Sequence, residues 1–211
     1  MQRQVFATIK IFVLACALFL GVMPTTSAAN QGFGDVPADH WAYDAVMYVD
    51  SMNLVHHYDG NTFRGSENAT RYDLAYMMGR MAQMAQVQAD KNFKGFSDVP
   101  KKHWCAQYVN LATNNTEKLE FMSGYGDGTF RGDEEVNRFD VALAFAAFAQ
   151  IKAAGNEQIF TDIPADHWAY DAVNALGERG IMEGYGDGSF RGENKITRYE
   201  VAMICVKVIA Q

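Results

Sequence analysis

Apolar residues recur along this chain at the spacing of amphipathic helices. The clearest series places apolar side chains at relative positions 0, 3, 4 and 7, which lines one face of a helix. It occurs three times: Leu74, Met77, Met78 and Met81; Val141, Ala144, Phe145 and Phe148; Val201, Ile204, Cys205 and Val208. Each series begins with a capping box, formed by Thr70 with Asp73, Asn137 with Asp140, and Thr197 with Glu200. The pattern therefore predicts three helices with defined N-termini.

A second amphipathic segment precedes each of these helices and starts at a His-Trp pair. Its members are Trp41, Ala45, Tyr48 and Met52 in the first copy, and Trp168, Ala172 and Leu176 in the third. The tryptophans fall on the apolar stripe, so the pattern alone predicts that they are buried. Between the two helices lie the loops Gly124 to Gly128 and Gly184 to Gly188, where glycine permits positive φ angles. Each unit is predicted to be helix, Gly-rich loop, helix.

The unit is repeated three times. FGDVPADHWAYDAV begins at Phe33, FSDVPKKHWCAQYV at Phe96 and FTDIPADHWAYDAV at Phe160. Because one such unit is too small to bury both apolar faces, the three units are expected to share a core. The sequence predicts an all-α fold in which three helix-loop-helix repeats form one pseudo-threefold helical domain. The expected boundaries are residues 30–91 for repeat 1, 92–155 for repeat 2 and 156–211 for repeat 3.

Residues 1–29 have the pattern of a secretory signal peptide. Arg3 and Lys10 precede an apolar run from Ile11 to Val22, and small residues follow up to Ala29. The run is shorter than the ~20 residues of a membrane-spanning helix, and no later stretch is longer. We therefore expect an exported protein of the cell wall or periplasm with no transmembrane segment after cleavage.

Composition argues against nucleic-acid partners and against metal or cofactor sites. The formal net charge is −7, and the basic surface that nucleic acids require is absent from such a chain. Cys105 and Cys205 have no neighbours at metal-ligand spacing and are interpreted as small packing residues. No cofactor or metal site is predicted. The repeated histidines are expected to make capping or turn contacts, and the aspartates of the Gly-rich loops to form turns; these residues are His40, His103, His167, Asp127 and Asp187.

Three motifs of the repeated unit resemble the S-layer homology (SLH) repeat. They are Phe-x-Asp-Val/Ile-Pro followed by His-Trp, then Gly-Tyr-Gly-Asp-Gly-Thr/Ser-Phe, then Thr-Arg-Tyr-Asp/Glu. The resemblance implies a pseudo-trimer whose inter-repeat grooves bind cell-wall glycan, either a pyruvylated secondary polymer or modified peptidoglycan. It implies ligand-binding roles for Arg198, Arg138, Arg71, Trp168, Trp104, Trp41, Gly184, Gly186, Gly124 and Gly126.

Two copies depart from the family pattern. Repeat 1 has His57 to Thr62 in place of the Gly-Tyr-Gly-Asp-Gly loop, and repeat 2 has Asn137 in place of Thr together with an inserted loop near residues 114–118. Repeat 3 keeps the whole pattern. Arg198 is therefore the residue most expected to bind a ligand.

The three arginines also stand out on physical grounds. Each follows a helix N-cap, where the helix dipole disfavours a cation by ~0.3–1 kcal/mol. An anion held by the guanidinium and by first-turn N–H groups would explain the choice. The alternative is pairing with an aspartate of a Phe-x-Asp motif, namely Asp35, Asp98 or Asp162.

These features favour non-covalent anchoring to the bacterial envelope through a wall glycan. An alternative is an assembly adaptor or lattice protein that acts through contacts with other envelope proteins. An enzyme such as a wall hydrolase is the least expected class, because the repeated carboxylates lie in near-identical settings. The sequence also has no Ser/His/Asp, Cys/His or zinc-site spacing.

Overall fold

The computed structural model describes residues 32–153, 155 and 157–211. In these residues the chain forms three longer helices, α3 (Arg71–Met84), α5 (Arg138–Ala149) and α7 (Arg198–Ile209), and three shorter ones, α2 (Tyr43–Ser51), α4 (Ala106–Thr113) and α6 (Tyr170–Glu178). The predicted all-α fold of three repeats is confirmed. The proposed signal peptide, residues 1–29, lies outside the described residues.

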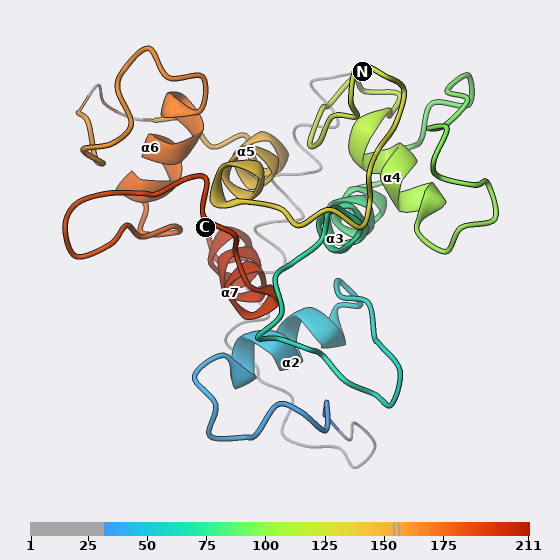
Figure 1. Ribbon diagram of the computed structural model, residues 1–211, viewed down its shortest axis with the longest axis horizontal. Coiled ribbons are helices and arrows are strands. Elements are labelled where there is room, and N and C mark those ends of the chain that lie inside the picture. Colours follow the sequence, from blue (N-terminus) through green and yellow to red (C-terminus); the bar gives the residue numbers. More distant parts are fainter. Residues whose placement is uncertain (1–31, 154, 156) are drawn as a thin grey trace.

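The longer helices stand together at the centre, and one short helix flanks each of them on the outside (Figure 1). The short helix of each repeat packs on the long helix of the preceding repeat: α4 on α3, α6 on α5, and α2 on α7. A repeat is therefore not a self-contained helical hairpin. Because α2 of the first repeat packs on α7 of the last, the three repeats close into a ring around one core.

The capping boxes predicted from the sequence are formed in all three long helices. The Thr70 side chain accepts a hydrogen bond from the Asp73 N–H, and the Asp73 carboxylate accepts one from the Thr70 N–H. Asn137 with Asp140, and Thr197 with Glu200, make the same pair of bonds. These bonds satisfy N–H groups that a helix start leaves without partners, and they fix where each long helix begins.

The core contains the whole apolar series of the three long helices and, from the series of the short helices, Ala45 and Leu176. Cys105 and Cys205 are fully buried, which confirms that they serve as packing residues. The Phe of each Phe-Arg-Gly element is also buried; these residues are Phe63, Phe130 and Phe190. No helix in the part of the chain that the structure describes is long and apolar enough to cross a membrane.

The loop glycines have two different structural roles. Positive φ occurs at the last glycine of each intact loop, at +81° in Gly128 and +82° in Gly188. At Gly124 the requirement for glycine is steric, because a Cβ atom would lie 2.0 Å from the Phe96 ring. The expectation that these glycines supply positive φ is therefore correct only for the last one.

Candidate ligand grooves between the repeats

The arginine that starts each long helix reaches across to the loop of the next repeat. Arg138 donates from Nε to the Phe190 carbonyl at 2.9 Å and from Nη2 to the Glu183 carbonyl at 2.6 Å. The equivalent acceptors are the Phe130 and Ser123 carbonyls for Arg71, and the Phe63 and His56 carbonyls for Arg198. The three arginines are 8%, 8% and 5% exposed in chain order, so each joins two neighbouring repeats from a buried position.

The first-turn N–H groups of the long helices bond to the same neighbouring loop. In α5 the Arg138 N–H donates to the Asn194 carbonyl and the Phe139 N–H to the Gly192 carbonyl, both at 3.0 Å. The partial negative charge of these carbonyls complements the positive helix end. The first-turn amides, which the sequence suggested would bind an anion, therefore already donate to carbonyls of the protein. The guanidinium is the group that remains for a ligand.

The aromatic residue after each arginine fills the space above a glycine of the next repeat. A Cβ atom on Gly65 would lie 2.1 Å from the Tyr199 ring, and Gly132 with Tyr72 and Gly192 with Phe139 have the same relationship. The glycine of the Phe-Arg-Gly element is thus required by packing between repeats, because any larger side chain would overlap the ring.

The aspartate of each Phe-x-Asp motif holds its own repeat together. The Asp98 carboxylate accepts hydrogen bonds from the Phe130 N–H at 2.8 Å and the Arg131 N–H at 2.7 Å. Burial raises the pKa of Asp98, but these backbone bonds outweigh it and bring the pKa below its usual value. Asp35 and Asp162 make the same contacts. The alternative pairing of these aspartates with Arg71, Arg138 and Arg198 is therefore wrong.

The histidines and loop aspartates make the turn contacts expected of them. Nδ1 of His40 accepts from the Ala42 N–H at 3.2 Å, and His103 and His167 do the same in their repeats. Asp127 accepts from the Thr129 hydroxyl at 2.6 Å, pairs with Arg131 at 2.9 Å and accepts from the Thr129 N–H at 3.0 Å, and these contacts lower its pKa to about 2. The described residues contain no His, Cys, Asp and Glu cluster that could hold a metal ion.

The three tryptophans are exposed, so the prediction of burial from helical periodicity is wrong. Trp41, Trp104 and Trp168 are 62%, 43% and 63% exposed. The reason is that α2 begins at Tyr43, two residues later than the pattern suggested, and its buried face consists of Ala45, Val46 and Val49. Each tryptophan stands before its helix, and the indoles of Trp41 and Trp168 are the more exposed of the three.

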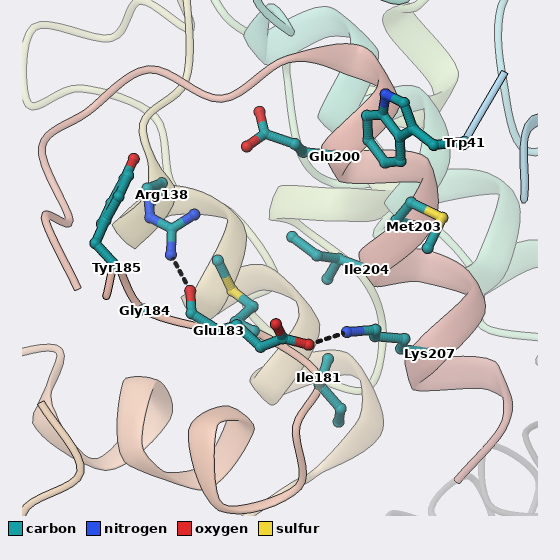
Figure 2. Close-up of a pocket in the computed structure, with 11 residues that line it drawn as sticks. Trp41, Arg138, Ile181, Glu183, Gly184, Tyr185, Glu200, Met203, Ile204 and Lys207 are labelled. Atoms are coloured by element: carbon teal, nitrogen blue, oxygen red, sulfur yellow. Dashed lines mark hydrogen bonds and ion pairs between the residues drawn. The ribbon is translucent and has the colours of Figure 1, made fainter. Parts of the chain in front are cut away.

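An open groove lies at Arg138 and takes residues from all three repeats. It encloses about 310 Å³ and is lined by Arg138 of repeat 2, Tyr185 and the exposed face of α7 from repeat 3, and Trp41 of repeat 1. Figure 2 shows Arg138 on one side, Trp41 on the other, and the Glu200 carboxylate between them. The arrangement combines a guanidinium and an exposed indole across one hollow.

Polar side chains that the sequence did not single out complete this groove. The Glu183 carboxylate pairs with Lys207 at 2.9 Å along its lower edge (Figure 2). The Tyr185 ring lies 5.4 Å from the Arg138 guanidinium and 4.3 Å from that of Arg191. Comparison of the repeats could not identify Glu183 and Lys207 as groove residues, because the equivalent positions in repeat 2 hold Ser123 and Ala147.

The groove at Arg198 is different, because Arg198 faces the atypical loop of repeat 1. Its Nη1 forms an ion pair with Asp73, which also accepts from the Tyr58 hydroxyl at 3.1 Å. The space that remains is about 10 Å³. The intact loop of repeat 3, Gly184 to Gly188, lies beside Arg138 instead. The helix pairing across repeats therefore separates the most typical arginine from the most typical loop.

Comparison with known proteins finds the same three repeats. The model of the S-layer homology domain family matches residues 32–75, 95–142 and 159–202. The chain is 29% identical to "S-layer protein sap" of Bacillus anthracis, over 94% of this chain and 24% of that protein. It is 29% identical to "Cellulosome-anchoring protein" of Acetivibrio thermocellus, over 70% of this chain and 33% of that protein. It is 45% identical to "Outer membrane protein SlpA" of Deinococcus radiodurans, over 33% of this chain and 6% of that protein. The chain thus spans a third or less of the length of these relatives.

Proposed function

Because the chain belongs to the S-layer homology family, we propose that it anchors non-covalently to the bacterial cell envelope by binding a wall glycan between its repeats. The observation that supports this best is the groove at Arg138, where a cation and an exposed indole face one hollow of about 310 Å³. The ligand classes proposed are a pyruvylated secondary polymer and modified peptidoglycan. The protein would be exported and act at the cell wall or in the periplasm.

The groove offers two contacts that a charged glycan needs. Arg138 uses Nε and Nη2 for carbonyls of repeat 3, and no described residue accepts a hydrogen bond from its Nη1. A ligand carboxylate can bind there through a charge-assisted hydrogen bond. Across the groove the exposed face of Trp41 can pack against the apolar face of a sugar ring.

The relatives support anchoring as the biological outcome. One is named for a surface layer and another for cellulosome anchoring. In this chain the described residues form only the repeats, and their repeated carboxylates are used for capping boxes and backbone contacts. These uses fit a binding module better than a hydrolase.

Co-sedimentation with purified sacculi tests the proposal. The protein should pellet with sacculi without any other protein present, and extraction of the sacculi with hydrofluoric acid should show whether a phosphodiester-linked polymer is the ligand. Trp41→Ala should weaken pelleting without changing the melting temperature, because this side chain is exposed. Ile159→Ala, which trims another exposed apolar side chain outside the groove, is the control.

Two results would count against the proposal. Failure to pellet with either kind of sacculus would exclude glycan binding and favour an adaptor that needs another envelope protein. Equal pelleting by Trp41→Ala and the native protein would exclude the groove at Arg138 as the site.

A further inference from the structure

The junction between repeats 3 and 1 contains the same parts as the open groove, but its own side chains fill it. At Arg138 the Nη1 atom has no acceptor among the described residues, whereas at Arg198 the same atom is bound by the Asp73 carboxylate. Asp73 is 8% exposed in its side chain and Arg198 is 5% exposed. A carboxylate of the protein thus occupies the place proposed for a carboxylate of the ligand.

The tryptophan of this junction is also covered by the protein. The His56 ring stacks on Trp104 with centroids 4.1 Å apart and an angle of 17° between the planes. Repeats 2 and 3 have Ser123 and Glu183 at the position of His56, so neither supplies an aromatic ring there. The ring of His56 occupies the indole face that a sugar would use.

A tyrosine hydroxyl explains why Asp73 stays in the groove. The Tyr58 hydroxyl donates to Asp73 at 3.1 Å and so turns toward Arg198. In the other loops the equivalent hydroxyls turn outward, because Tyr125 donates to Glu134 at 2.9 Å and Tyr185 accepts from Asn194 at 3.3 Å. Three contacts therefore close one junction, and the described residues make none of the three at the other two junctions.

From these contacts we infer that the junction between repeats 3 and 1 does not bind the wall ligand. The side chains of Asp73 and His56 fill this junction in place of a ligand and join the last repeat to the first. Ligand binds only at the groove of Arg138 and at the equivalent junction of Arg71. This inference rests on the proposed function, since it concerns the same class of ligand, and it gives the protein two ligand-binding junctions for three repeats.

The chain allows a direct test because it has three tryptophans, one for each junction. Trp41 reports the groove at Arg138 and Trp104 the junction at Arg198. By the repeat pattern Trp168 reports the junction at Arg71. In an NMR titration with soluble fragments from muramidase-digested sacculi, the indole N–H signals of Trp41 and Trp168 should shift. Trp104 should shift with a midpoint at least about tenfold higher, or not at all.

A double variant should open the closed junction. In His56→Ser with Asp73→Asn, the first change installs the residue of repeat 2, and the second keeps a capping acceptor but removes the charge. The Trp104 signal should then shift at the same fragment concentration as Trp41. Asp140→Asn makes the matching change in the capping box of α5 and should leave Trp104 unresponsive.

Each remaining outcome has a distinct meaning. A Trp104 shift in the native protein at the Trp41 midpoint would overturn the inference, as would an unresponsive Trp104 in the folded double variant. If no tryptophan signal moves, the proposed function fails. The closed junction is then judged from the Nη protons of Arg198, which should exchange with water more slowly than those of Arg138. Asp73→Asn should abolish that difference, and equal exchange in the native protein would refute the closed junction.

Discussion

Arg198, the first residue of the last helix, forms a buried ion pair with Asp73, the N3 residue of the capping box in the first repeat's long helix. The pair joins positions 125 residues apart in the sequence. This ion pair joins the last repeat to the first and so closes the ring. Substitution of Arg198 is therefore expected to lower the stability of the fold.

Arg198→Ala should destabilise the fold. The substitution removes the ion pair and two hydrogen bonds to carbonyls, and it leaves the Asp73 charge buried without its partner. Loss of one member of a buried pair costs about 3–5 kcal/mol. Urea denaturation should show this loss in the free energy of unfolding. Arg191→Ala removes an exposed pair with Asp187 and should leave the free energy of unfolding almost unchanged. Equal stability of the two variants would contradict a structural role for Arg198.

Gly65→Ala should also destabilise the ring, through overpacking. A methyl group at this position would overlap the Tyr199 ring, so the loop of repeat 1 and the start of α7 would have to separate. Overpacking of this kind costs about 1–3 kcal/mol. Gly34→Ala is the matched control in the same repeat, because a Cβ atom there meets nothing within 4 Å. If both variants melt at the temperature of the native protein, Tyr199 does not pack as described.

The sequence predicted the local structure well, because local structure depends on short spacings. The apolar series and the capping boxes placed the starts of α3, α5 and α7 at the correct residues. The sequence could not predict that short helices pack on the preceding repeat. Packing within a repeat and packing between repeats bury the same helix faces, so the periodicity is identical for both.

The candidate site was also only partly predictable from the sequence. The helix-end argument assigned Arg71, Arg138 and Arg198 to an anion, whereas in the structure each also donates to a carbonyl of the next repeat. Trp41 was assigned to a buried stripe because its spacing to Ala45 is helical, although it precedes the helix. Their ligand-binding roles, and those of the loop glycines, remain predictions.

Removal of the first repeat should destroy cooperative unfolding. Residues 92–211 lack both α2, which covers α7, and α3, on which α4 packs. Two of the three helix pairs are then lost, and the apolar faces they bury become exposed to water. Thermal melting of this fragment should be broad and at lower temperature than that of residues 30–211. A fragment that melts as sharply and at as high a temperature would show that the repeats do not depend on one core.

The closed junction should make stability depend on pH just below neutrality. Burial lowers the pKa of His56 from its usual value of 6.5, the Asp73 charge opposes this, and the nearby Arg198 and His57 reinforce it. In the unfolded chain His56 titrates near its usual pKa, so the unfolded state binds the proton at a higher pH than the folded state does. The free energy of unfolding should therefore rise with pH through the window just below about 6.5 and level off above it.

Urea denaturation at a series of pH values between about 5 and 8 measures this dependence. His56→Gln should flatten the rise, because it removes the group whose pKa differs between the two states. His57→Gln is the matched control, since it changes the adjacent histidine, which pairs with Asp50 and is half exposed. It should leave the His56 contribution in place. If His56→Gln keeps the full slope, the stacked position of His56 on Trp104 has no part in the pH dependence.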